Sequence, residues 1–214
     1  MSYARHTMTT VDPSNYHAIM SIANSDDFGD FSEWSGLALI RVVRVGEDRF
    51  LTTGGYKYKG SADANADKAS AVFGKMASLM TSAPVVREGE IVWAFDGDQS
   101  LTAGYVRHVI FTYDPERYEA MMARVESTTE RFRGGSGLQR VRLVHCEEPD
   151  RTPRMFSSVL FDNKTSADAG QENMKAIMAG IDEVIIYDQT VLGVAQFGKS
   201  ISVREGEVIW SYYR

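Results

Sequence analysis

The sequence predicts an α+β protein made of two tandem βαββαβ units, each with an antiparallel sheet. The segment Arg87–Trp93 returns almost unchanged as Arg204–Trp210, which indicates an internal duplication. Within each half, apolar residues follow the spacing of strands and helices in the same order. We therefore expect two similar units, at residues 1–98 and 105–214, joined by a linker at residues 99–104.

Shorter matches between the two halves keep the same order along the chain. The matched pairs are Arg5-His6 with Arg107-His108, Asp12-Pro13 with Asp114-Pro115, Tyr16 with Tyr118, Ser35-Gly36-Leu37 with Ser136-Gly137-Leu138, Arg41 with Arg142, and Ser61–Ala64 with Ser166–Ala169. A series of matches in one order is the signature of tandem copies rather than of chance similarity.

Local signals place the elements of the first unit. Thr-rich, β-branched or alternating stretches predict strands, and these are Tyr3–Val11, Leu37–Val45 and Arg49–Lys59. A helix follows the first strand, with Asp12 as its N-cap and Pro13 at the first helical position, where a missing N–H costs nothing. Apolar residues at helical spacing predict one long amphipathic helix from Ala62 to Met80.

The second unit repeats this order and carries extra residues near its end. Its expected strands are Tyr105–Tyr113, Leu138–Cys146 and Arg154–Phe161, and its expected helices begin near Tyr118 and near Met174. Val184–Tyr187 is expected to add a strand, and Gln189–Gly198 is an insertion that the first unit lacks.

The repeated segment predicts a β-hairpin at the end of each unit. Apolar residues precede Arg87 and Arg204, alternating apolar residues follow Glu90 and Glu207, and a Gly stands between. A Gly between two alternating runs is typical of a tight turn, because it adopts the backbone conformations that such turns require.

Composition excludes several function classes. The net charge of −6 argues against nucleic acid or an anionic membrane as the main partner, since both attract basic surfaces. Cys146 is the single cysteine, so neither a disulfide framework nor a thiolate metal cluster is expected. No signal peptide or membrane-spanning apolar run is evident, and we expect a cytoplasmic protein.

Several strands carry consecutive apolar residues, such as Leu39-Ile40 and Val109–Phe111, so both faces of each sheet need burial. Packing the two sheets against each other within one chain would meet this need. In its order of elements and its duplication, the chain resembles the dimeric α+β barrel superfamily, which includes the antibiotic-biosynthesis monooxygenase-like proteins. The resemblance implies an intramolecular α+β barrel of two ferredoxin-like units.

The resemblance also implies a small, often aromatic or polyketide-like ligand, held between helices and sheet or inside the barrel. Members include cofactor-independent monooxygenases, haem-binding enzymes, and isomerases or lyases. A homodimer is compatible with it. Whether the protein is an enzyme stays open at this point.

The candidate catalytic residues are His6 and His108, which occupy the same place on the first strand of each unit. A histidine in a partly closed apolar cavity can transfer protons near neutral pH. Neighbours on a strand point to opposite faces, so either the histidines or Arg5 and Arg107 line a pocket, and the sequence does not decide which. The alternative is a hydrogen-bonded structural histidine kept in both copies.

The candidate substrate-binding residues are Arg5, Trp34, Tyr56, Tyr58, Arg107 and His145. Trp34, Tyr56 and Tyr58 have no counterpart in the second copy, so duplication alone does not explain them, and aromatic rings can stack on a planar ligand. The equivalent Trp93 and Trp210 are expected to form core, and His145 to lie at a pocket rim.

Motifs for other chemistry are missing from the sequence. Four scattered histidines without close ligand spacing make a metal site unexpected. Neither a phosphate-binding Gly-rich loop nor a Gly-x-Ser-x-Gly elbow is present.

Three hypotheses follow. The first is a cofactor-free, monooxygenase-like enzyme that acts on an aromatic or polyketide-like substrate. The second is a non-catalytic ligand-binding or structural barrel. The third is a haem enzyme, with His6, His108 or His145 as the axial ligand.

Overall fold

The computed structural model describes residues 1–25, 28–147, 153–181 and 201–214. The predicted strand Val184–Tyr187 and the insertion Gln189–Gly198 lie outside the described residues. No helix within the described ranges is long and apolar enough to cross a membrane.

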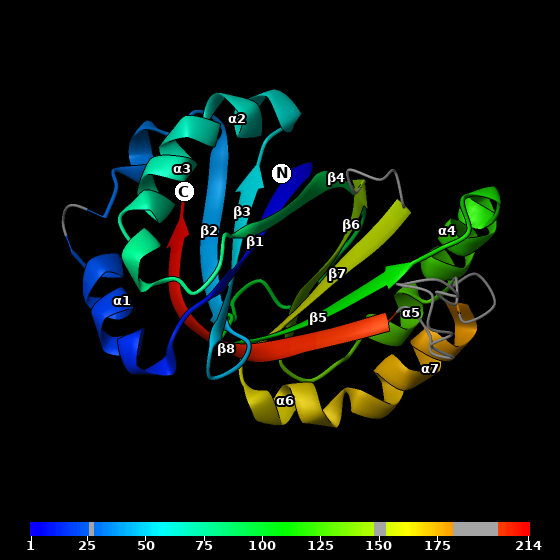
Figure 1. Ribbon diagram of the computed structural model, residues 1–214. Coiled ribbons are helices and arrows are strands. Elements are labelled where there is room, and N and C mark those ends of the chain that lie inside the picture. The colour runs from blue at the N-terminus through cyan, green and yellow to red at the C-terminus, as the bar shows by residue number, and fades with distance from the viewer. Residues whose placement is uncertain (26–27, 148–152, 182–200) are drawn as a thin grey trace, which may run out of the picture. The chain divides into compact units, whose positions relative to one another are not determined.

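The predicted α+β fold class is confirmed. The strands are β1 (Tyr3–Thr10), β2 (Leu37–Arg44), β3 (Arg49–Tyr56), β4 (Val85–Asp96), β5 (Tyr105–Thr112), β6 (Leu138–Glu147), β7 (Pro153–Phe161) and β8 (Ile201–Tyr213). The helices are α1 (Tyr16–Ala23), α2 (Lys59–Ala64), α3 (Ala66–Gly74), α4 (Tyr118–Ser127), α5 (Thr129–Phe132), α6 (Lys164–Ala169) and α7 (Gln171–Ile181) (Figure 1). The strands are hydrogen-bonded in the order β1-β3-β2-β8-β5-β7-β6-β4 of a closed barrel.

Contacts divide the chain into two compact units. The first comprises Met1–Ile91 and Gly206–Arg214, and the second comprises Val92–Glu205. These units differ from the boundaries expected at residues 98 and 105, because β4 and β8 each begin in one unit and end in the other.

The predicted terminal hairpins are wrong. Arg87–Trp93 lies within the single strand β4, and Arg204–Trp210 lies within the single strand β8. Gly89 pairs with Ala4 of β1 in a regular antiparallel ladder. The described glycines with a positive φ angle are Gly36, Gly134 and Gly137, so neither repeated Gly adopts a turn conformation of that kind.

Gly206 serves a different purpose, which is close approach between strands. A Cβ atom at this position would lie 1.6 Å from the carbonyl oxygen of Arg44 on β2. The register of the β2–β8 ladder shifts between Val42 and Val43, close to this contact. The glycine is therefore required by packing of backbone on backbone.

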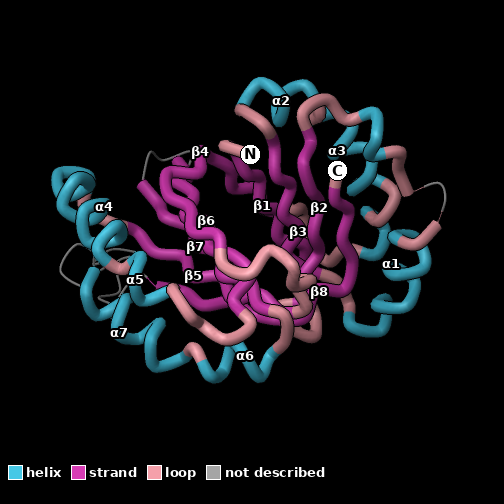
Figure 2. The backbone as a smooth tube through the Cα atoms, turned by 180° about the vertical axis from the view of Figure 1, so that it is seen from behind, coloured by secondary structure: helices cyan, strands magenta, loops and turns pink. Residues whose placement is uncertain are grey.

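In the first unit, α1 and α3 cover one face of the sheet formed by β1, β3, β2 and the last part of β8 (Figures 1 and 2). The long helix expected from Ala62 to Met80 is interrupted between α2 and α3. The side-chain amide of Asn65 donates to the carbonyl oxygen of Ser61 at 2.7 Å, and also to that of Ser35 at 2.9 Å. The Asn65 side chain thus occupies the Ser61 carbonyl oxygen, which a continuous helix would use as a backbone acceptor. Its second bond connects the helix break to Ser35, just before β2 begins.

In the second unit, α4 to α7 lie along the sheet of β5, β7 and β6 (Figure 2). Helix starts are repeated, because Asp12 and Asp114 each accept a backbone hydrogen bond two residues later and each precede a proline. In both units a short 3₁₀ turn comes before the α-helix, so the predicted cap is correct and the helix begins one turn later.

Candidate functional site

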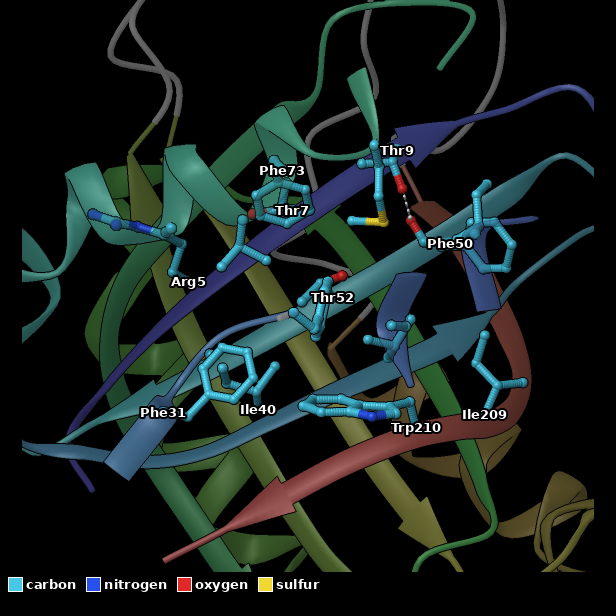
Figure 3. Close-up of a pocket in the computed structure, with 18 of the residues that line it drawn as sticks. Arg5, Thr7, Thr9, Phe31, Ile40, Phe50, Thr52, Phe73, Ile209 and Trp210 are labelled. Atoms are coloured by element: carbon cyan, nitrogen blue, oxygen red, sulfur yellow. Dashed lines mark hydrogen bonds between the residues drawn. The ribbon is translucent and has the colours of Figure 1, made fainter. Parts of the chain in front are cut away.

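An apolar cavity of about 70 Å³ lies between the helices and the sheet of the first unit (Figure 3). A groove of about 480 Å³ adjoins it, between α3 and strands β1 and β4. Cavity and groove share Arg5, Thr7, Ala69 and Phe73, so the groove reaches the cavity past these side chains. The volume of the groove is typical of sites for small organic ligands, and the cavity extends it inward.

Aromatic rings form one side of the cavity. Phe31 packs edge-to-face on Trp34, with ring centroids 5.2 Å apart, and on Trp210, with centroids 5.5 Å apart. Edge-to-face contacts fix the orientation of the rings, and the remaining ring faces suit a planar apolar ligand. Trp210 comes from β8, so the last part of the chain completes this wall.

Threonine side chains contribute hydroxyl groups to the sheet side of the cavity. Thr7 and Thr9 point from β1 toward the helices, and Thr52 does so from β3 (Figure 3). Thr7 stands directly opposite Thr52 in the antiparallel ladder. The cavity is thus apolar on its helix side and carries hydroxyl groups on its sheet side.

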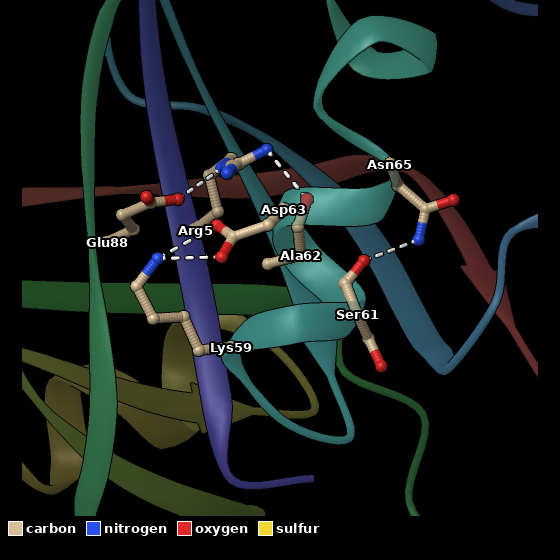
Figure 4. Close-up of polar contacts among 7 residues, drawn as sticks. All are labelled: Arg5, Lys59, Ser61, Ala62, Asp63, Asn65 and Glu88. Atoms are coloured by element: carbon tan, nitrogen blue, oxygen red, sulfur yellow. Dashed lines mark hydrogen bonds and ion pairs between the residues drawn. The ribbon is translucent and has the colours of Figure 1, made fainter.

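A charged pair lies where the groove meets the cavity. The Arg5 Nε donates to Glu88 of β4, and its Nη1 donates to the carbonyl oxygen of Ala62 at 3.3 Å (Figure 4). Burial alone would lower the pKa of Arg5, but the hydrogen bond and charge of Glu88 outweigh it and raise the pKa. Arg5 therefore stays cationic and is neutralised locally by Glu88.

Tyr56 also lines the cavity. Burial raises the pKa of its hydroxyl, and the nearby Arg5 charge only partly opposes this, so the phenol stays protonated at neutral pH. Gly54, two residues earlier on β3, lies under the ring, since a Cβ there would be 3.0 Å from a ring carbon. The missing side chain at Gly54 lets the tyrosine ring lie across the sheet.

The equivalent place in the second unit is more completely filled. Its cavity measures about 40 Å³. Val109 and Phe111 stand where the first unit has Thr7 and Thr9, and Met174 stands where it has Ala69. Larger apolar side chains therefore narrow this space in the second unit, which makes the first unit the better candidate for a ligand site.

Other polar contacts occur in both units. Arg107 donates to Glu205 at 2.6 Å and to the carbonyl oxygen of Ala167 at 3.2 Å, which repeats the contacts of Arg5. The Lys59–Asp63 pair of α2 is likewise repeated in α6. In both units these contacts join the helix, the first strand and the last strand.

Solved structures with this arrangement of elements are similar to the chain over nearly its whole length. A candidate monooxygenase from Fusobacterium nucleatum subsp. nucleatum has a TM-score of 0.73 and 11% identity, covering 100% of this chain and 94% of that one. An anthrone oxidase-like protein has a TM-score of 0.67 and 11% identity, covering 99% and 93%. A ferredoxin-fold protein related to antibiotic biosynthesis monooxygenases, from Listeria monocytogenes, has a TM-score of 0.52 and 8% identity, covering 96% and 95%.

The chain has the dimeric α+β barrel fold. No family model matches the sequence, and no curated protein is similar to it. At 8–11% identity, the solved structures establish the fold alone.

In this dimeric α+β barrel, the predicted catalytic histidines lie on the sheet face opposite the helices. Arg5 and Thr7 line the helix-side cavity, so His6 between them points the other way, and the same holds for His108 beside Val109. The Nδ1 atom of His6 is 3.0 Å from the Thr53 hydroxyl, and that of His108 is 2.9 Å from the Ser158 hydroxyl. Neither histidine meets the cavity, and their catalytic roles stay predictions.

The predicted binding residues separate into two groups. Arg5, Trp34 and Tyr56 meet at the first unit's cavity. The other three lie elsewhere: Tyr58 is 55% exposed, Arg107 pairs with Glu205, and His145 is 3.0 Å from the Tyr113 hydroxyl. Trp210, expected in the core between sheets, instead lines the cavity on the helix side.

Sequence reasoning missed Thr7, Thr52 and Ala69. A difference between the two halves of the sequence could have indicated these residues. When the matched segments are aligned, Thr7 corresponds to Val109 and Ala69 to Met174. Positions that are small or polar in one unit and large and apolar in the other indicate where the cavities of the two units differ.

The haem hypothesis can be tested against the donors of this cavity. None of the described residues that line the cavity or the groove is a histidine or a cysteine. The Nε2 atom of His145 is 3.0 Å from the Tyr113 hydroxyl, and its ring packs against Tyr118. The residues of this site therefore do not fit a haem held by an axial histidine.

Proposed function

We propose that the protein is a small-molecule enzyme of the monooxygenase-like type, which oxidises an aromatic or polyketide-like substrate with O₂ without a resident cofactor. The observation that carries the proposal is the asymmetry between the units: the first has an aromatic-walled cavity of about 70 Å³ that adjoins a groove of about 480 Å³, whereas the equivalent cavity of the second measures about 40 Å³. The anthrone oxidase-like protein with the same fold supports this choice of substrate class.

The reaction that suits such a site converts an activated methylene into a carbonyl. The substrate loses a proton to a base, its carbanion passes electrons to O₂, and a C–O bond forms. Loss of water then leaves the carbonyl, with one oxygen atom in the product and the other in water. The apolar walls exclude bulk water from the reacting carbon.

Glu88 is our candidate for the proton acceptor. It is the carboxylate among the described residues that line the cavity or the groove, and it accepts a hydrogen bond from the Arg5 Nε, which orients it. Removing a positioned general base typically lowers rates by about 100-fold or more. We therefore expect Glu88→Gln to lower the rate of O₂ uptake by about 100-fold.

Glu205→Gln is the matched control for this substitution, because it breaks the equivalent ion pair in the second unit. A structural role for Glu88 predicts that both variants lose the same stability and the same activity. Equal losses of O₂ uptake in both variants would contradict the role of Glu88 as base.

The location of the site is tested by exchanging one residue between the units. Ala69→Met introduces the larger side chain that the second unit carries at Met174. It should block the junction of cavity and groove and lower substrate affinity and O₂ uptake at least tenfold. The measurement is O₂ consumption with an anthrone as substrate. Met174→Ala enlarges the second cavity and should leave the rate unchanged.

A binding protein without catalysis would behave differently in the same experiments. Aromatic compounds would bind to the wild type and not to Ala69→Met, but no O₂ would be consumed with any of them. That result would support the cavity as a ligand-binding site and contradict the proposed oxidation.

A further inference from the structure

We infer that the ligand of the first unit's cavity is an uncharged aromatic molecule that carries a hydroxyl or keto oxygen, which the hydroxyls of Thr7 and Thr52 bind. This inference rests on the proposed function, because it names the class of ligand that enters the same site. It adds a recognition element that the aromatic walls alone do not provide.

The two hydroxyls form a pair on neighbouring strands. Thr7 of β1 and Thr52 of β3 stand directly opposite each other, on the face that lines the cavity (Figure 3). Opposite side chains in an antiparallel ladder are separated by about 5 Å at Cβ, so both hydroxyls can reach a single ligand atom. The pair thus forms a small polar patch on the sheet side of the cavity.

Neither hydroxyl is used by the protein within the described ranges. The hydroxyl of Thr9 donates to the carbonyl oxygen of Phe50 at 3.5 Å, whereas Thr7 and Thr52 make no side-chain hydrogen bond to another described residue. Thr7 is only 3% exposed. Hydroxyls that line a cavity and are unpaired in the fold are suited to pairing with a ligand oxygen.

The charges at the site favour an uncharged ligand. Arg5 is the charged residue among the described side chains that line the cavity, and Glu88 already neutralises it. A carboxylate ligand would lose its hydration without gaining an unengaged cation, which is costly in an apolar site. A hydroxyl or keto group needs only the hydrogen bonds that threonine can give or accept.

The second unit shows what the site becomes without this pair. Val109 replaces Thr7, and Ser157 replaces Thr52, beside the smaller cavity. Valine has nearly the shape of threonine, so Thr7→Val and Thr52→Val remove one hydroxyl each with little change in packing. Ser157→Ala removes the corresponding hydroxyl from the second unit and is the control.

The test measures binding of naphthalene, 1-naphthol and 1-naphthoate to the full chain by isothermal titration calorimetry at pH 7. We expect 1-naphthol to bind at least fivefold more tightly than the other two compounds. Thr7→Val and Thr52→Val should each weaken 1-naphthol binding about fivefold and leave naphthalene binding unchanged. Ser157→Ala should bind all three compounds as the wild type does.

The place of binding is read from ¹⁹F NMR of protein labelled with 5-fluorotryptophan. Trp34 and Trp210 line the first cavity and Trp93 lines the second, and these are the three tryptophans of the chain. Signals of Trp34 and Trp210 should shift on addition of 1-naphthol, while the signal of Trp93 should not.

Three results would overturn the inference: wild-type affinity for 1-naphthol in both valine variants, tighter binding of 1-naphthoate than of 1-naphthol, or a shift of Trp93 alone. Failure of the proposed function gives a different pattern. In that case 1-naphthol binding remains selective and sensitive to both valine variants, but no aromatic substrate supports O₂ uptake.

Discussion

Gly206→Ala is expected to lower the free energy of unfolding by roughly 3–4 kcal/mol, above the usual cost of overpacking. The added Cβ would lie 1.6 Å from the Arg44 carbonyl oxygen and 2.6 Å from its carbonyl carbon, and both are backbone atoms that cannot rotate away. Strands β2 and β8 must separate to admit the methyl group. Urea unfolding followed by circular dichroism measures the loss.

Gly74→Ala is the control for the general effect of replacing a glycine. A Cβ at Gly74, at the end of α3, meets nothing within 4 Å, and its φ angle is not positive. We expect this variant to be as stable as the wild type or slightly more stable, since alanine restricts the unfolded chain. Equal stability of Gly206→Ala and the wild type would show that the strands do not approach each other as described.

His6 is expected to make the protein sensitive to acid. Burial, together with the positive charge of Arg41, lowers the pKa of His6 to about 3, from an ordinary value of 6.5. Above pH 6.5 the histidine is neutral in both the folded and the unfolded chain, so it contributes no pH dependence. Below pH 6.5 the unfolded chain binds the proton and the folded chain does not, so stability falls as the pH falls.

The slope of this loss is about 1.4 kcal/mol per pH unit, because one proton is bound on unfolding. Between pH 6.5 and pH 4 the contribution of His6 reaches roughly 3 kcal/mol. His6→Asn keeps a polar partner for Thr53 but removes the titration, so the wild type should lose about that much more stability than the variant over this range.

The experiment compares urea unfolding at a series of pH values from 7 to 4. Acidic residues that titrate in the same range affect wild type and variant alike, so the difference between the two curves isolates His6. The control is His17→Asn, which replaces an exposed histidine on α1 and should follow the wild-type curve. Parallel curves for His6→Asn and the wild type would show that His6 is not held neutral in the fold.

The sequence predicts the order of elements well because that order depends on local periodicity. The three strands and the helix caps of each unit end within a few residues of their expected positions. The break between α2 and α3 depends on Asn65 reaching Ser35, 30 residues away, and no local pattern reports such a contact. The same limit explains the wrong prediction of terminal hairpins. Gly206 is needed because the backbone of the neighbouring strand β2 lies close to it, and not because the chain turns there.

The candidate site was only partly predictable for a related reason. Unpaired aromatic residues led to Trp34 and Tyr56, which do line the cavity, but also to Tyr58, which is exposed. The alternation of β1 left two options for the residues facing the helices. Only the cavity that Arg5 and Thr7 share with Phe73 of α3 shows that the arginine set, and not the histidine set, faces the helices.

The passage of β8 from the second unit into the first has a consequence for biosynthesis. Ile209 and Trp210, which complete the cavity wall, are translated after all of the second unit. At about 5–20 residues per second, on the order of 10 s separates the synthesis of Ile91 from that of Gly206. During this interval the nascent first unit lacks β8, so one side of its cavity and the edge of β2 are exposed. We therefore expect this chain to depend on chaperones more than a chain in which each unit is complete before the next is synthesised.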